Sequence, residues 1–313
     1  MHGGGGYPVN HVELQNALSV RQRALLIRRR EFTLANVISS ILVIENLDKP
    51  HSSRERSMSE AVEFKRIKDQ VSADEWAVRE DLAAAYRLVA HYGWDDMVFT
   101  HLSARVPGPE DHFLLNPFGF LFSEVTASNL VKIDCDGNVV LDNGHRVNTA
   151  GFTIHSAVHM SRPDAQAVMH LHTDAGVAVA SMECGFMPLT QHAMFVYHDT
   201  AYHEWEGVAI NLDEQERLVA DLGAKHLMIL KNHGTLALGG SVASCFLRMY
   251  YLERACRIQV DTLSSGKPHM PTQDAISMME SSLGRPEVWE GLAKSSWPAL
   301  RRQADRIDPT YKD

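Results

Sequence analysis

The chain has 313 residues, of which 45% are hydrophobic and 22% are charged, and its formal net charge is -9 at pH 7. This is the composition of an ordinary globular protein with enough apolar residues for a sizeable core. The negative charge excludes a broad basic surface, so we do not expect nucleic acid as a partner.

Residues 1–70 are expected to form an N-terminal extension that is partly helical or disordered. Its longest apolar stretch, residues 34–47, is about 14 residues long and includes Asn36 and Glu45, so it is too short and too polar to cross a bilayer. No membrane partner is therefore expected. Arginines over residues 21–30 leave an amphipathic organellar presequence as an alternative, and a linker-like segment follows at 48–59.

The cysteines are widely spaced and form no CxxC pair. Neither a disulfide framework nor a cysteine metal site is expected, and reduced thiols are typical of a cytoplasmic protein.

Regular structure is predicted from residue 74 onward. Asp74 can cap a helix whose apolar residues form one stripe and which ends at Gly93. A tight turn at residues 134–138 joins two short apolar runs and indicates a hairpin. The strands predicted in this half of the chain cover residues 98–106, 113–115, 131–133 and 139–141.

In the second half, strand and helix patterns alternate. The predicted elements are a helix from about 153 that stops before Pro163, a strand at 167–171, a helix from 174 to about 182, a helix at 214–222 after a less regular stretch, strands at 227–230 and 235–238, and a helix from 241 to about 260. The hairpins within this pattern favour a mixed sheet. We predict one α/β domain over residues 71–265, with a C-terminal extension at 266–313.

Two histidines, His170 and His172, close the apolar strand predicted at 167–171. Residues i and i+2 of a strand project from the same face, so both imidazoles can reach one ion. His233 follows a second apolar strand, at a strand end where α/β proteins commonly build sites. Three neutral imidazoles suit zinc, iron(II), cobalt or manganese and leave a coordination position open.

His155 and His159 form a competing pair, four residues apart on one helical face. A zincin motif would have a general-base Glu directly after the first histidine, and Ser156 stands there instead. A metalloprotease site is therefore disfavoured, and His155 is expected to pack beside the active site.

Residues 99 to about 263 resemble the class II aldolase/adducin family, most closely its adducin head-domain branch. The resemblance is carried by six blocks in the family's order: 100–105 (THLSAR), 116–119 (NPFG), 125–133 (VTASNLVKI), 150–156 (AGFTIHS), 170–172 (HLH) and 231–234 (KNHG). It implies a three-layer α/β/α fold with a central mixed, largely antiparallel sheet. It also implies a tetramer with sites at subunit interfaces.

By this resemblance, His170, His172 and His233 match the family's metal-binding histidines, with zinc as the first expected metal. The resemblance places the substrate-binding positions at His101, Asn116, Gly119, Thr149 and Gly151.

The departures from the family pattern concern the catalytic base and the phosphate site. In the sugar-phosphate aldolases an acidic residue stands at the position of Gly151. Two small hydroxyl residues before it bind the substrate phosphate, and here Thr149 keeps one hydroxyl while Ala150 has lost the other. The Asn that contacts phosphate in those aldolases is replaced here by His101. A positioned acid/base group contributes roughly 10²–10⁴-fold in rate, so ordinary sugar-phosphate cleavage is disfavoured. His155 and His192 are the candidate catalytic replacements.

The sequence thus favours a metal-dependent lyase, for aldol cleavage or decarboxylation of a small, non-phosphorylated carbonyl or hydroxy-acid substrate. A non-haem iron(II) oxygenase or decarboxylase on the same fold is one alternative. An adducin-like scaffold is another, although Arg301-Arg302 is the only basic pair in residues 266–313, which are far from a polybasic tail.

Overall fold

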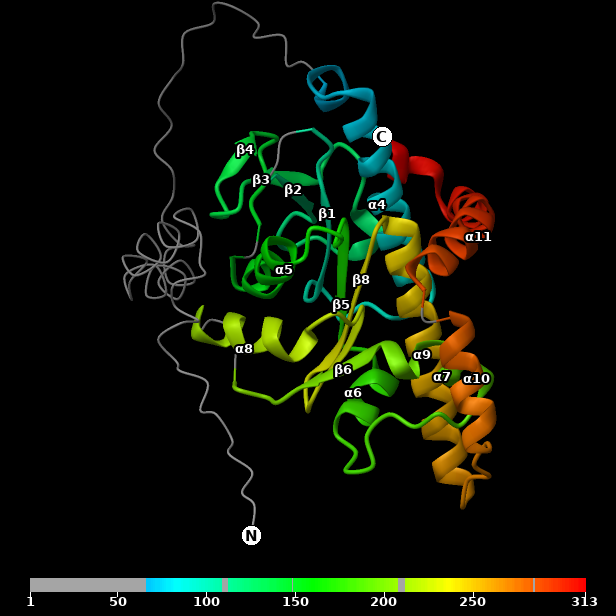
Figure 1. The fold of residues 1–313 in the computed structure, drawn as a ribbon. Coiled ribbons are helices and arrows are strands. Elements are labelled where there is room, and N and C mark those ends of the chain that lie inside the picture. Colours follow the sequence, from blue (N-terminus) through cyan, green and yellow to red (C-terminus); the bar gives the residue numbers. More distant parts are fainter. Residues whose placement is uncertain (1–65, 109–111, 148, 208–211, 284) are drawn as a thin grey trace, which may run out of the picture. The chain divides into compact units, whose positions relative to one another are not determined.

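The computed structural model describes residues 66–108, 112–147, 149–207, 212–283 and 285–313 (Figure 1). The predictions for the arginine-rich segment and the linker-like segment lie outside these residues. Among the described helices, none is both long enough and apolar enough to cross a membrane.

A single eight-stranded sheet forms the centre of the described part of the chain. Its strand order is β4-β3-β2-β1-β5-β8-β7-β6, and every pair is antiparallel except β6 with β7. The strands are β1 (His101–Arg105), β2 (Phe113–Leu115), β3 (Val131–Ile133), β4 (Val139–Leu141), β5 (Ala167–Leu171), β6 (Thr200–His203), β7 (Leu227–Leu230) and β8 (Gly234–Gly239).

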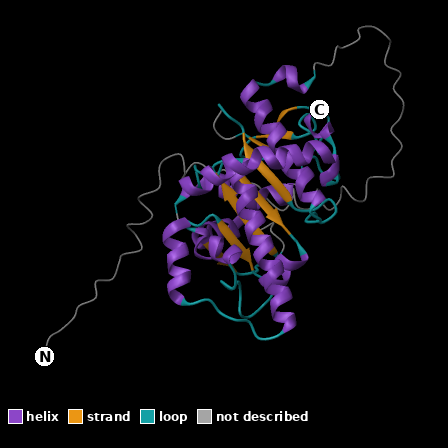
Figure 2. Ribbon diagram, turned by 90° about the vertical axis from the view of Figure 1, so that its right-hand side faces the viewer, coloured by secondary structure: helices purple, strands orange, loops and turns teal. Residues whose placement is uncertain are grey.

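The larger core lies on one face of this sheet. Leu102 of β1, Met169 of β5 and Ala237 of β8 point into it. The helices that cover this face, and the others that pack on them, are α4 (Ala73–His91), α6 (Asp174–Ala180), α7 (Gln191–Val196), α9 (Val242–Ser265), α10 (Gln273–Leu283) and α11 (Pro286–Ile307). Figure 2 looks onto this face, where helices lie in front of the strands.

The opposite face is covered by α5 (Thr149–Ser161) and α8 (Leu212–Leu222), with Val158 and Leu218 in its core (Figure 1). Side chains alternate between the faces of a strand. Because Leu102 and Met169 face α4 and α9, the side chains of His101, Ser103 and His170 are directed to the α5 face. The α/β/α fold with a mixed, largely antiparallel sheet is therefore confirmed.

Most predicted strands match the observed bounds, but several other boundaries differ. The helix predicted from about residue 153 begins at Thr149, and the helix predicted to end at about residue 260 ends at Ser265. The cap of α4 and the start of β1 also differ from the prediction. Ser72, not Asp74, caps α4, because its side chain accepts the amide of Glu75 at 3.1 Å. Strand β1 begins at His101 rather than at residue 98, because Met97 and Thr100 have positive φ angles of 52° and 64° and cannot continue a strand.

The region after α9 is helical and packs on the main core. Trp289 and Trp297 of α11 are 2% and 8% exposed, and both belong to the same buried cluster as α4 and α9. Helices α7, α10 and α11 and strand β6 were not predicted individually from the sequence.

Candidate metal centre

The three histidines of the predicted metal site lie together at one end of the sheet. His170 and His172 come from the end of β5, and His233 from the turn between β7 and β8. Their ring centroids are 4.7, 4.8 and 4.8 Å apart, and one nitrogen of each ring lies within 4.8 Å of the other two. A tetrahedral ion at about 2.0–2.1 Å from each nitrogen would hold them roughly 3.4 Å apart, so a small adjustment suffices.

Hydrogen bonds on the outer side of two rings determine which nitrogens face the centre. Nδ1 of His170 donates to the carbonyl of Thr235 at 3.0 Å, and Nδ1 of His172 donates to Asp96 Oδ2 at 3.0 Å. In the neutral rings both protons are then on Nδ1, so both Nε2 atoms carry bare lone pairs. These two Nε2 atoms are 3.0 Å apart, a separation that requires a proton or a cation between them. With the third imidazole alongside, the donor set fits a divalent metal ion.

The backbone of the β7–β8 turn brings His233 to the other two rings. Asn232 adopts φ +57°, a left-handed conformation that Asn tolerates, and its amide donates to the carbonyl of Ala180. A Cβ on Gly234 would overlap the carbonyl oxygen of Leu171 and lie 3.1 Å from His172 Cδ2. Glycine at position 234 therefore allows the two strand ends to approach closely enough to form the site.

Asp96, which orients His172, was not predicted from the sequence. It lies in the loop between α4 and β1, 76 residues before its partner. The loop is closed by the amide of Phe99, which donates to the carbonyl of Asp96 at 2.9 Å. Carboxylates in this position fix the tautomer and raise the basicity of ligating histidines.

A buried carboxylate on α9, Glu253, supports the site from the other face of the sheet. It accepts the hydroxyl protons of Thr173 and, at 2.6 Å, Thr235. Thr173 follows the ligand His172 and also caps α6, and Thr235 carries the carbonyl that receives the His170 proton. Burial raises the pKa of Glu253, and the two threonine hydroxyls partly offset this. Sequence reasoning did not identify this residue.

Two of the three clustered histidines, His170 and His233, have lowered pKa values, which favours the neutral form that metal binding requires. Burial and the neighbouring His172 lower the pKa of His233 to about 4. Burial, together with His233 and His172, lowers the pKa of His170 well below its ordinary value. The pKa of His101, which lies opposite His170 on β1, is lowered to about 4 by burial and by His172.

His155 lies on α5, near His101, with their ring centroids 6.1 Å apart. Its Nδ1 is 2.6 Å from Ser103 Oγ, and the same hydroxyl is 2.8 Å from Nε2 of His159. The sequence prediction that His155 packs beside the centre agrees with this position. Ser103 was not singled out, because only the fold reveals that it faces α5.

The other predicted site residues lie in different surroundings. His192 is on α7, with its ring centroid 6.0 Å from that of Tyr251 on α9. Asn116 is buried, and its side-chain oxygen accepts the hydroxyl of Tyr86 at 2.9 Å. Gly119 is exposed with φ +87°, and Thr149 and Gly151 lie in the first two turns of α5.

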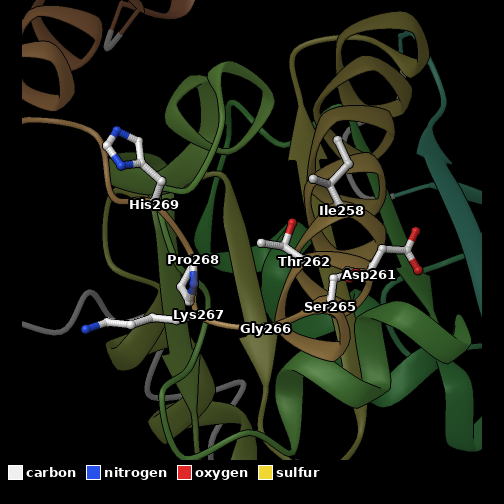
Figure 3. A pocket seen from close by; sticks show the side chains of 8 residues that line it. All are labelled: Ile258, Asp261, Thr262, Ser265, Gly266, Lys267, Pro268 and His269. Atoms are coloured by element: carbon white, nitrogen blue, oxygen red, sulfur yellow. The ribbon is translucent and has the colours of Figure 1, made fainter.

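A surface hollow of about 610 Å³ lies at the C-terminal end of α9 (Figure 3). It is lined by Ile258, Asp261, Thr262, Ser265, Gly266, Lys267, Pro268 and His269. None of the three clustered histidines lines it, so it is separate from the metal centre.

Comparison with known proteins identifies relatives over most of this fold. The family described as "Class II Aldolase and Adducin N-terminal domain" matches residues 80–260. A putative aldolase class 2 protein of Caulobacter vibrioides is 52% identical over 250 residues, covering 79% of this chain and 96% of that protein. Mouse alpha-adducin is 38% identical over 260 residues, covering 77% of this chain but only 35% of its own length.

Two solved structures extend this comparison. An aldolase II superfamily protein from Pseudomonas syringae has a TM-score of 0.75 at 46% identity, covering 79% of this chain and 99% of that one. L-fuculose 1-phosphate aldolase from Glaciozyma antarctica has a TM-score of 0.68 at 29% identity, covering 77% of this chain and 94% of that one.

Proposed function

The chain belongs to the class II aldolase and adducin family, and on this premise we propose that it is a metal-dependent lyase. The proposed substrate is a small, non-phosphorylated carbonyl or hydroxy-acid compound. The observation that carries the proposal is the convergence of His170, His172 and His233, with two bare Nε2 lone pairs 3.0 Å apart. A divalent ion held by these three histidines, with zinc as our first choice, would polarise a carbonyl and lower the pKa of a substrate hydroxyl.

His155 is our proposed proton-transfer group in place of the family's acidic residue. Burial, with His101 and His159 nearby, lowers the pKa of His155 well below its ordinary value, so it is a neutral acceptor at pH 7. A weak base suffices where the substrate hydroxyl is itself acidified. The contacts favour His155 over His192, whose ring packs near Tyr251 on α9.

The proposal of a non-phosphorylated substrate rests on position 101. His101 is 5% exposed, and its pKa of about 4 makes it uncharged at pH 7. Its imidazole replaces the phosphate-contacting Asn of the sugar-phosphate aldolases and can hydrogen-bond to a hydroxyl or carbonyl, and Ala150 lacks a hydroxyl that those enzymes use for phosphate.

The similarity to alpha-adducin supports a second candidate, a non-catalytic scaffold. The matched segment is about a third of that protein, so the activity of the whole adducin does not transfer to this chain. The converging imidazole nitrogens favour the enzyme, because a scaffold has no need of a preorganised open metal position.

We further propose a cytosolic homotetramer with sites at its subunit interfaces. In support, Met97, Phe99 and Phe118 are 67%, 48% and 53% exposed. Met97 directly follows Asp96, which orients His172, and Phe99 lies three residues after Asp96 in the same loop. Exposed apolar side chains beside a site are typical of interaction surfaces. Light scattering coupled to size exclusion tests this, and a monomer at all concentrations would overturn it.

The lyase proposal is tested by screening small hydroxy acids and hydroxy-aldehydes with the zinc-loaded full-length protein. The expected result is cleavage that requires zinc, proceeds equally without dioxygen and is lost in the His172→Ala variant. Turnover only with iron(II) and dioxygen would replace the lyase by the oxygenase alternative. Absence of turnover across the screen, with zinc bound, would favour the scaffold.

A further inference from the structure

Three buried side chains, His159, Ser103 and His155, form a continuous hydrogen-bonded chain between α5 and β1. They are 1%, 0% and 1% exposed. Nδ1 of His159 is 2.9 Å from the carbonyl oxygen of Ala165. Ser103 Oγ is 2.8 Å from Nε2 of His159 and 2.6 Å from Nδ1 of His155. All are normal hydrogen-bond lengths.

The position of every proton in this chain follows from its carbonyl end. A carbonyl only accepts, so Nδ1 of His159 carries a proton and donates it to Ala165. Burial lowers the pKa of His159 to about 3. The hydrogen bond to the Ala165 carbonyl opposes this shift, and the positive charge of Arg105 adds to it. The ring is therefore neutral at pH 7, and its Nε2 must accept the hydroxyl proton of Ser103.

Ser103 has only one proton, so its remaining contact must be as an acceptor. It therefore accepts from His155, whose proton lies on Nδ1 and whose Nε2 is bare. Among the described residues no hydrogen-bond partner exists for this buried Nε2. An unpartnered polar atom this deeply buried is destabilising, so this Nε2 is a candidate to bind a ligand.

The surroundings of His155 indicate which ligand. The ring centroid of His155 is 6.1 Å from that of His101, and His101 is paired across β1 and β5 with the proposed metal ligand His170, whose side chain points to the same face of the sheet. In the opposite tautomer, Nε2 would carry a proton and could only donate. A bare Nε2 can accept a hydroxyl proton.

We propose that Ser103 and His159 are positioning residues that hold His155 as the Nδ1–H tautomer, with Nε2 ready to accept the proton of a substrate hydroxyl. The chemical step rests on the proposed lyase function, whereas the tautomer does not. In aldol cleavage the substrate O–H bond breaks and an N–H bond forms at Nε2. The oxygen's electron pair forms the carbonyl of the departing aldehyde, and the breaking C–C bond leaves its pair on the other fragment, which takes the proton back at carbon.

The tautomer is measured by long-range ¹H–¹⁵N NMR of the full-length protein labelled with ¹⁵N-histidine, zinc-loaded and metal-free. The His155 signals among the 17 histidines are assigned by their loss in His155→Gln. We expect a protonated Nδ1 and an unprotonated Nε2 in the parent. In Ser103→Ala we expect averaging between tautomers, with zinc stoichiometry retained.

Ser156→Ala is the matched control, because it removes another buried serine hydroxyl, adjacent to His155 on α5, and should leave the His155 pattern unchanged. An Nε2–H tautomer in the parent, or an unchanged pattern in Ser103→Ala, would overturn the proposal; if Ser103→Ala does not fold, the parent spectrum decides. If zinc does not bind but the expected pattern is found in metal-free protein, the lyase proposal fails while the tautomer assignment stands.

Discussion

Asp96 Oδ2 lies 3.0 Å from Nδ1 of His172, so a loop residue 76 positions earlier in the chain sets the orientation of a proposed metal ligand. The carboxylate of Asp96 is partly exposed, at 43%. Its effect on global stability should therefore be small, while its effect on the ligand should be direct.

Replacing Asp96 by Ala should weaken zinc binding by roughly 10–100-fold, because His172 loses the partner that fixes its tautomer. Competition with a chromophoric chelator measures the affinity. Asp95→Ala is the matched control, since it removes the neighbouring carboxylate while the hydrogen bond between Asp96 and His172 remains. Equal affinities in the two variants would show that Asp96 does not orient a ligand.

Gly234→Ala should destabilise the protein by about 1–3 kcal/mol or more, because the new Cβ would overlap the carbonyl of Leu171. Urea unfolding gives the change. Gly291→Ala on α11 is the control: nothing lies within 4 Å of its Cβ, and alanine in a helix should stabilise by about 0.5–1 kcal/mol. A Gly234→Ala variant as stable as the parent would refute the close approach at Gly234.

Thr235→Val keeps the branched shape in β8 but removes the hydroxyl that donates to Glu253 at 2.6 Å. The buried carboxylate then lacks one donor, at a cost of about 1–3 kcal/mol. The backbone carbonyl that receives the His170 proton remains, so zinc stoichiometry should not change. An unfolding midpoint equal to that of the parent would contradict this role for Thr235.

Acid should destabilise the fold through His159. Its pKa is about 3 in the folded chain against an ordinary value of 6.5, because burial disfavours the imidazolium. The unfolded chain therefore binds the proton first as pH falls. The stability contribution is complete above about pH 6.5 and is lost towards pH 3, at up to about 1.4 kcal/mol per pH unit.

Urea unfolding of metal-free protein between pH 7 and pH 4 measures this slope. His159→Gln should show a smaller slope than the parent, because one titrating group is removed. Identical slopes would mean that His159 is not held neutral by the fold.

Strands of strong apolar character were predictable, as were the three clustered histidines. The HxH spacing alone places His170 and His172 on one face of β5, and the antiparallel pairing with β8 then brings in His233. The family resemblance added the layer arrangement, which strand patterns do not define.

The supporting residues were not predictable, because their roles depend on contacts across distant elements. Ser103 and Glu253 are ordinary residues in the sequence and acquire partners only when β1 faces α5 and α9 packs on β8. The start of β1 was misplaced because apolar residues before His101 resemble a strand, although positive φ angles interrupt it.

The central claim is that His170, His172 and His233 hold one metal ion. Elemental analysis of untagged protein purified without added metal, followed by zinc titration, tests it directly. The expected result is about one equivalent per chain in the parent and below about 0.2 in His172→Ala. A parent below about 0.2 equivalents with no rise in Tm on adding zinc, or full occupancy in His172→Ala, would contradict it.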